Sequence, residues 1–281
     1  MRDLTRSNRK ELIAFFVLTF ILSWAIWVPV MTRSFGLPGL AFPPAGLVGA
    51  LGPGLAAMAV VLARGGWPEL RKLVGQIGVW RVGIRWYAAA LLVPALIGVV
   101  FVGAGIWRGA WLPAPAFSAG ALATMILIQV PNTLLEEIGW RGFALPRMAP
   151  WLGWLGSSLL IGVIWAAWHL PYWISAPNVH QYGVASVALF FAMPVSASMF
   201  LALMYRQTRG SVLLTWLTHL AINVTIAFMP LSSEDIGDLW PQTIYTIGIV
   251  VIGLVCAIKL ATRRPGFDRL RFSSPRPFTP A

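Results

Sequence analysis

Few residues in this chain can carry charge or form a covalent cross-link. Of its 281 residues only one is a cysteine, Cys256, which lies inside an apolar run. A single cysteine excludes an intrachain disulfide and a metal site built from several thiolates. Charged residues make up only 11% of the chain, and only nine residues are acidic. Soluble domains average about 25% charged residues, so this composition excludes an ordinary soluble globular protein.

The chain is instead rich in apolar and aromatic residues. Hydrophobic residues make up 58% of the chain, fifteen residues are tryptophan, and the mean hydropathy is +0.76. The formal net charge of +12 could by itself indicate a nucleic-acid-binding protein. The basic residues, however, lie at the ends of apolar runs and form no contiguous basic face, which is typical of membrane topology. We therefore expect an all-α integral membrane protein in contact with lipid, and no nucleic-acid partner.

Apolar stretches long enough to span a bilayer as a helix, about twenty residues each, occur eight times. We expect them to form a polytopic bundle of about eight transmembrane helices in a single membrane domain, residues 1–281. The expected helices lie near residues 12–31, 42–63, 86–107, 119–141, 155–175, 184–205, 211–230 and 242–260.

The positions of Lys and Arg predict the orientation of the bundle. With the N-terminus placed in the cytoplasm, 19 of the 21 Lys and Arg residues fall in cytoplasmic segments and two fall outside. This asymmetry follows the positive-inside rule and predicts that both termini are cytoplasmic, with residues 1–11 and 261–281 as tails. Residues 64–85 alternate apolar and basic positions and are too polar to span, so we expect them to lie on the membrane surface.

Very few ionisable groups are expected at membrane depth, where each costs roughly 2.5–3.5 kcal/mol to insert. Alone, an intramembrane His or Asn is often only an interhelical hydrogen bonder. Here the deep polar groups gather in three helices of the second half of the chain, which favours a hydrated reactive cavity. The group comprises Glu136, Glu137, Arg141, His169, His219 and Asn223.

Helical spacing separates the two glutamates. Glu137 and Arg141 are four residues apart with the acid first, which favours an intrahelical ion pair. Glu136 points about 100° away from that pair. It is therefore free to face a cavity and to act as a general base.

A spacing of four residues also occurs in the expected helices near 155–175 and 211–230. Trp165 precedes His169 by one turn and can fix its ring, while His219 and Asn223 share one face of their helix. The depths of Glu136, His169, His219 and Asn223 differ by on the order of 10 Å along the membrane normal. Their convergence therefore requires helix tilt or a kink.

These motifs resemble those of the CAAX protease and bacteriocin-processing (CPBP, or Abi) intramembrane proteases, relatives of the type II CAAX prenyl endopeptidases. The family pattern is Glu-Glu-x-x-x-Arg, Phe-x-x-x-His and His-x-x-x-Asn, and it matches residues 136–141, 165–169 and 219–223 in order. The implied protease core is approximately residues 119–230. Trp165 stands where Phe is usual, and because it keeps an aromatic ring beneath His169 we expect unchanged chemistry.

The resemblance implies hydrolysis of a peptide bond within the membrane. A glutamate and a histidine would activate water, and a histidine and an asparagine would stabilise the oxyanion. The implied catalytic residues are Glu136, His169, His219 and Asn223, supported by Glu137, Arg141 and Trp165.

Family members are commonly described as metalloproteases, and a metal-free glutamate mechanism is the alternative. Glu136, His169 and His219 could bind zinc with water as the fourth ligand. The sequence, however, contains neither H-E-x-x-H nor two histidines four residues apart. It favours glutamate-activated water and leaves zinc open.

Two other functions are compatible with deep ionisable residues. A proton-coupled carrier would predict an inverted repeat with paired broken helices, and no such repeat is evident. A non-catalytic scaffold or immunity protein would leave the motifs without a use. The resemblance instead implies a peptide or prenylated protein substrate, and a prokaryotic cytoplasmic membrane with the active site opening towards the cytoplasm.

Overall fold

The structure is a computed structural model, and it describes residues 2–34, 36, 45–108, 119–171, 183–227 and 240–262. Within these ranges the regular elements are all helices, which confirms the all-α class. The elements are α1 (Arg2–Ser34), α2 (Ala45–Ala50), α3 (Gly52–Gly75), the 3₁₀ turn η1 (Gln76–Gly78), α4 (Ile84–Trp107), α5 (Ala119–Glu137), the π-helix η2 (Ile138–Ala144), α6 (Leu145–Trp168), α9 (Val184–Gln207), α10 (Val212–Ala227) and α12 (Trp240–Ala261).

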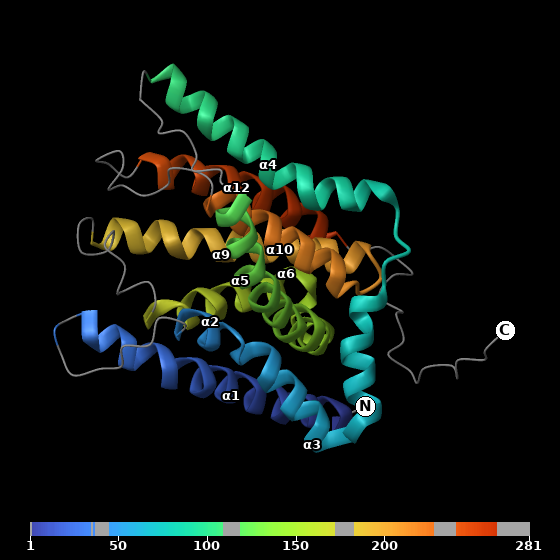
Figure 1. Cartoon of the computed structure of the whole chain (residues 1–281). Helices are drawn as coiled ribbons and strands as arrows, with labels where there is room; N and C mark the ends of the chain where they lie inside the picture. The colour runs from blue at the N-terminus through green and yellow to red at the C-terminus, as the bar shows by residue number, and fades with distance from the viewer. Residues whose placement is uncertain are drawn as a thin grey trace.

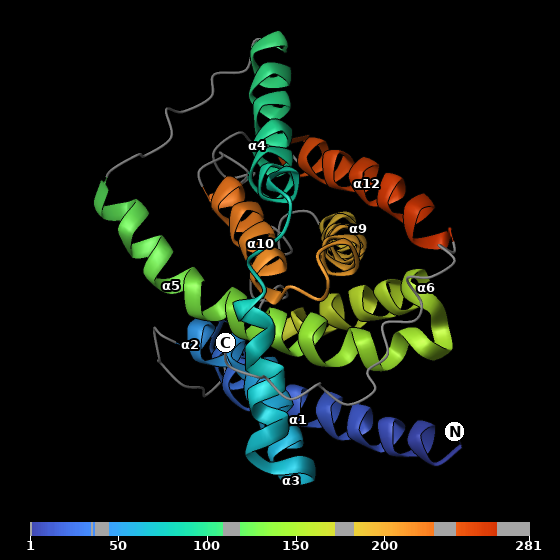
Figure 2. The ribbon, with the colours of Figure 1, turned by 90° about the vertical axis from the view of Figure 1, so that its right-hand side faces the viewer.

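Helix α9 occupies the centre of the bundle, packed against α6, α10 and α12 (Figure 2). Every residue from Ser196 to Arg206 is buried. Small residues permit this close packing, because a Cβ atom on Gly162 of α6 would lie only 2.6 Å from the Cα atom of Val195. Helices α1 and α3 pack together on one side of the bundle, and α4 packs on α10 on the other.

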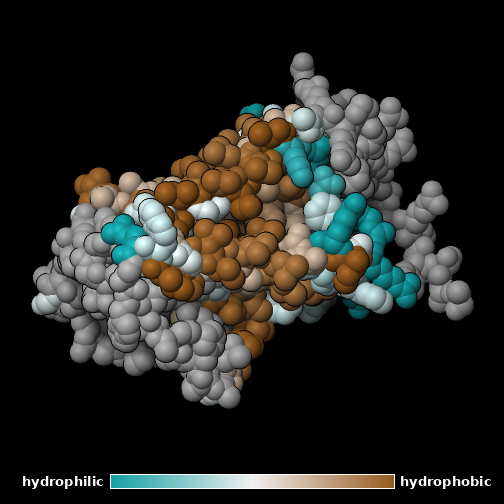
Figure 3. All heavy atoms as spheres, turned by 90° about the horizontal axis from the view of Figure 1, so that it is seen from above, coloured by the Kyte–Doolittle hydropathy of each residue, from teal (hydrophilic) through white to brown (hydrophobic). Residues whose placement is uncertain are grey.

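The outer surface is apolar over much of its length. Large apolar side chains of α1, α4 and α12 are exposed, and one face is dominated by hydrophobic residues, with hydrophilic residues gathered towards one end (Figure 3). Such a surface suits lipid, since soluble monomers rarely expose large apolar patches. In the described part of the chain, six helices are long and apolar enough to cross a membrane. The expected number of about eight stays a prediction.

One of the six candidates, Ala123–Trp168, has 46 residues and would be roughly 70 Å long if straight. It is bent back on itself at Gly153, whose φ of 68° is in the region that favours glycine. Figure 2 shows this reversal within α6. The α5–η2–α6 stretch is therefore a helical hairpin, and its second arm corresponds to the helix expected near 155–175.

Helix α3 is broken in the same way at Gly66, where φ is 62°. The part before the break packs on α1, and the part after it turns away and crosses the end of the bundle (Figure 1). The chain that follows this crossing segment and η1 is hydrogen-bonded to the turn between α9 and α10, because Ser211 Oγ donates to the carbonyl of Val79 at 2.7 Å. The break bends the helix before the polar residues that follow it, and their expected place on the membrane surface stays a prediction.

The cytoplasmic placement of residues 1–11 and 261–281 stays a prediction, and the structure adds where the first helix begins and where the last one ends. Helix α1 begins at Arg2, so residues 2–11 extend the first helix. Polar residues can continue a helix beyond the apolar stretch, which is why hydropathy alone placed its start too late. At the other end α12 ends at Ala261. The expected tail beyond residue 262 lies outside the described residues.

Candidate active site

The two glutamates lie where α5 passes into the π-helix η2. π-Helical turns inside α-helices are rare and occur often at functional sites. The turn lies tightly against α3, because a Cβ atom on Gly139 would come within 2.7 Å of the backbone carbonyl of Pro53. Glycine at this position allows the close approach that holds the glutamates against the rest of the bundle.

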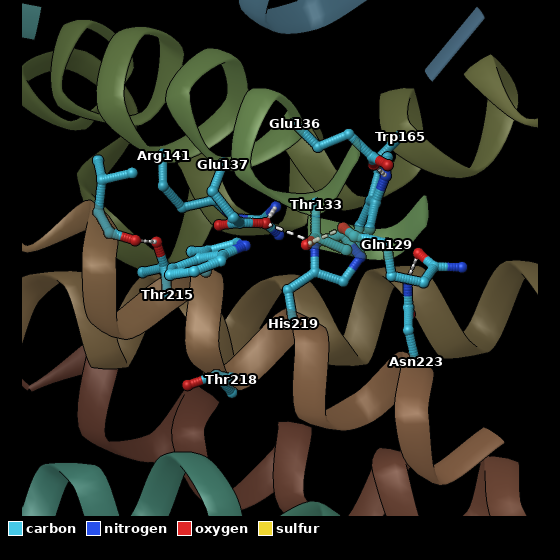
Figure 4. Close-up of polar contacts among 12 residues, drawn as sticks. Gln129, Thr133, Glu136, Glu137, Arg141, Trp165, Thr215, Thr218, His219 and Asn223 are labelled. Carbon is cyan, nitrogen blue, oxygen red and sulfur yellow. Dashed lines mark hydrogen bonds and ion pairs between the residues drawn. The ribbon is translucent and has the colours of Figure 1, made fainter. Parts of the chain in front are cut away.

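Glu137 lies at the centre of a buried ionic cluster. Its Oε1 accepts a hydrogen bond from Arg141 Nη1 at 2.8 Å and another from His219 Nδ1 at 2.9 Å (Figure 4). The three residues are 0%, 1% and 3% exposed, respectively. The predicted Glu137–Arg141 ion pair is therefore present. The contact with His219 of α10 is an addition that helical spacing within α5 could not predict.

Glu136 points in another direction, as its helical position predicts. Its Oε2 accepts a hydrogen bond from the indole Nε1 of Trp165 on α6, at 2.7 Å. Figure 4 shows the Glu136 side chain directed towards Trp165, away from Arg141. Glu136 is 5% exposed, whereas Glu137 is fully buried. The two carboxylates therefore have different partners: an ion pair for one and a neutral donor for the other.

His169 is the C-cap residue of α6, one turn after Trp165. Its Nδ1 lies 3.0 Å from the backbone oxygen of Trp165. A carbonyl oxygen only accepts, so Nδ1 carries the hydrogen and Nε2 keeps its lone pair. The imidazole is surrounded by the rings of Trp27, Trp168 and Phe190, with centroids 4.5–6.0 Å away.

Trp165 brings the three motifs together. Besides its bonds to Glu136 and His169, its ring lies edge-on to the ring of His219, with centroids 5.0 Å apart. The guanidinium carbon of Arg141 lies 4.8 Å from the centroid of the same indole. The structure thus brings together site residues for which the sequence predicted different depths along the membrane normal.

Asn223 lies one turn after His219 on α10 but has a different partner. Its Nδ2 donates to Gln129 Oε1 on α5 at 3.0 Å, and Thr133 Oγ1 donates to the backbone oxygen of Gln129 at 2.6 Å. Figure 4 shows Gln129, Thr133 and Asn223 close to His219. Gln129 and Thr133 were missed because neutral polar residues were considered only beside a histidine, as for Asn223. Gln129 lies eight residues and Thr133 four residues before Glu137, so the three side chains lie on one face of the helix.

The predicted zinc ligands are not arranged as a metal site. Among the residues that the structure describes, no three His, Cys, Asp or Glu side chains are grouped to hold a metal ion. Glu136 directs an oxygen at an indole N–H, and His219 directs Nδ1 at Glu137. Both histidines nevertheless keep Nε2 available, since each directs Nδ1 at an oxygen, so zinc bound by Glu136, His169 and His219 stays a prediction.

Comparison with known proteins agrees with the motifs. Residues 118–225 match the family model of type II CAAX prenyl endopeptidase Rce1-like proteins. The chain is also 24% identical, over 187 residues, to a protein from Methanococcus maripaludis named CAAX prenyl protease 2. That match covers 65% of each chain, so it spans just under two thirds of the curated relative. The family model covers all three motifs, so over residues 118–225 the chain is similar to the Rce1-like proteins.

Proposed function

We propose that this protein is an intramembrane endopeptidase that hydrolyses a peptide bond with water activated by Glu136 and His169. The observation that carries the proposal is the convergence of a carboxylate and two histidines on one residue, Trp165: Glu136 and His219 contact its indole, and His169 contacts its backbone oxygen. Ionisable groups that deep in a membrane protein are expensive, and they usually serve function.

In the proposed first step, a water molecule lies between Glu136 and His169. The Nδ1–H of His169 is held by a carbonyl oxygen, so its Nε2 can accept a hydrogen bond from that water. Glu136 takes a proton from the water as general base, and the resulting hydroxide oxygen forms a bond to the scissile carbonyl carbon. General-base catalysis of this kind contributes about 10²–10⁴-fold.

The tetrahedral intermediate carries a negative oxygen, which needs hydrogen-bond donors. His219, with Nδ1–H directed at the Glu137 carboxylate, can donate from Nε2 when both ring nitrogens are protonated. Asn223 uses one N–H for Gln129 and retains a second for the oxyanion. The carbon–nitrogen bond then breaks, and the proton held by Glu136 passes to the departing amine.

We propose that the chain crosses the membrane eight times with both termini in the cytoplasm. The two arms of Ala123–Trp168 and the short apolar helix Val212–Ala227 bring the six candidate spans to eight. The start of α1 and the end of α12 lie at the same end of the bundle as the segment after Gly66 (Figure 1). That end carries the basic residues that the positive-inside rule assigns to the cytoplasm.

Single cysteines test this topology in a Cys256→Ser background. Arg71→Cys, in the crossing segment, should react with a membrane-impermeant maleimide only in inverted vesicles. Arg108→Cys, after α4, should react only in right-side-out vesicles. Reaction of both from the same side would contradict the eight-span arrangement.

The substrate we propose is a peptide presented at the membrane, with a prenylated CAAX-type C-terminus as the first candidate. The curated relative is named a CAAX prenyl protease, and the exposed apolar surface provides contact with lipid. We place the protein in a prokaryotic cytoplasmic membrane with its site opening towards the cytoplasm.

The decisive experiment measures cleavage of a farnesylated fluorogenic CAAX peptide by the purified protein in detergent. We expect Glu136→Gln to lower kcat at least 100-fold while leaving the thermal unfolding temperature nearly unchanged. Glu69→Gln is the matched control, because Glu69 pairs with Lys72 on the exposed crossing segment. Full activity of Glu136→Gln would contradict the proposal. Loss of wild-type activity on chelation, restored by zinc, would contradict the metal-free step.

A further inference from the structure

We propose that the indole N–H of Trp165 is the group that positions Glu136 for catalysis, so that Trp165 acts through a hydrogen bond and not as an aromatic spacer. This inference rests on the proposed function of the same site. It also revises the expectation that an aromatic of either kind at this position leaves the chemistry unchanged.

The first support is the contrast between the neighbouring carboxylates. Glu137 is held by two basic side chains, Arg141 and His219. Among the hydrogen bonds of the described residues, Glu136 receives its bond from the neutral indole of Trp165, at 2.7 Å. A neutral donor can orient a carboxylate without neutralising it, which suits a group that must accept a proton.

The second support is the rigidity of the donor. The Trp165 side chain is 5% exposed. The Arg141 guanidinium lies against its indole, and the His219 ring meets it edge-on. Its backbone oxygen is bound by His169 Nδ1. An indole held at so many points cannot rotate its N–H away without disturbing the residues around it.

One residue therefore aligns both groups that would activate water. The side chain of Trp165 orients Glu136, and its main chain orients His169. The positions of Glu136 and His169 relative to each other are therefore set by one residue. Phenylalanine would keep the main-chain contact and most of the ring packing but would supply no donor to Glu136. The substitution thus separates packing from hydrogen bonding.

The test compares Trp165→Phe with an isosteric replacement of Trp165 by 3-benzothienylalanine, in which sulfur replaces N–H. For both we expect kcat to fall about 10–100-fold, the range typical of groups that orient a catalytic residue, with KM changed less than threefold. Trp140→Phe is the matched control. Trp140 is fully buried nearby, and its Nε1 has no hydrogen-bond partner among the described residues.

Infrared spectroscopy of protein labelled with ¹³C-glutamate provides a readout independent of activity. The Glu136 carboxylate band is assigned by difference from Glu136→Gln. It should shift in both Trp165 variants and stay in place in Trp140→Phe. A kcat within twofold of wild type for the benzothienylalanine protein, or an unshifted band, would overturn the inference. If wild type itself cleaves no peptide, the proposed function fails while the band still reports the hydrogen bond.

Discussion

Two clusters in this molecule have a similar composition but differ in how far water reaches them. In each, one glutamate lies between two basic side chains drawn from more than one element. At the site, Glu137 binds Arg141 and His219, and the three side chains are 0–4% exposed. At the end of the bundle, Glu11 of α1 meets Arg64 at 3.5 Å and Arg147 at 3.1 Å. There the side-chain exposures are 15%, 55% and 22%, respectively.

The difference shows that the contribution of a salt bridge to stability depends on how far it is buried. Exposed ion pairs contribute about 0–1 kcal/mol, because water solvates the separated charges nearly as well. Buried pairs pay a large desolvation cost, so their net contribution to stability is small or unfavourable, yet removing one partner is severe. The Glu11 cluster therefore fits an anchor between helices. The Glu137 cluster is better explained by the need to hold His219 and Arg141 in place.

The largest effect is expected for Glu137→Gln, at the buried cluster. The amide can still accept a hydrogen bond, but the charge that compensates buried Arg141 is lost. We expect a loss of about 3–5 kcal/mol in the free energy of unfolding, measured by SDS titration in mixed micelles, together with loss of peptide cleavage. A change below about 1 kcal/mol would show that the site cluster behaves like the exposed one.

A smaller effect is expected for Arg141→Lys. Lysine keeps the charge beside Glu137 but loses the planar guanidinium that lies against the indole of Trp165. The expected loss of stability is about 2 kcal/mol, the size of a desolvated cation–π contact, measured in the same titration. Arg64→Lys is the matched control at the Glu11 cluster, because the Arg64 side chain is 55% exposed, and an equal loss there would contradict the assignment.

The smallest effect is expected for Glu11→Gln. Its partners remain solvated after the substitution, so the free energy of unfolding should fall by at most about 1 kcal/mol. The difference from wild type should shrink as salt is raised to 1 M, because exposed charges are then screened within about 3 Å. Peptide cleavage should be unaffected. A loss as large as that of Glu137→Gln would remove the distinction between the clusters.

Contacts within one helix could be predicted from the sequence, and contacts between helices could not. The Glu137–Arg141 pair, the divergence of Glu136 and the Trp165–His169 spacing all follow from helical geometry. The bonds from Trp165 to Glu136 and from His219 to Glu137 depend on how the helices rotate against one another. That rotation is set by close approaches such as Gly139 against Pro53 and Gly162 against Val195, which a single sequence does not reveal.

The same reasoning explains what was missed in the fold and at the rim of the site. Apolar length located the spans, but hydropathy could not show that α1 begins at Arg2, since a helix may extend beyond its apolar part. Nor could it show that Gly66 and Gly153 adopt positive φ, because most glycines in helices do not. Gln129 was detectable in principle, as an amide in an apolar span that lies on the same helix face as Glu137, eight residues before it.

The α5–η2–α6 hairpin has a consequence for the order in which the protein is made. It carries Glu136, Glu137, Arg141 and His169 on one short stretch of chain, whereas His219 follows Glu137 by 82 residues. During synthesis the hairpin therefore enters the membrane before α10, which carries His219, has been made. Because Arg141 lies within the same hairpin, the charge of Glu137 has a local counterion from the start. The nascent chain can thus insert its acidic motif early and complete the site only when α10 emerges from the ribosome.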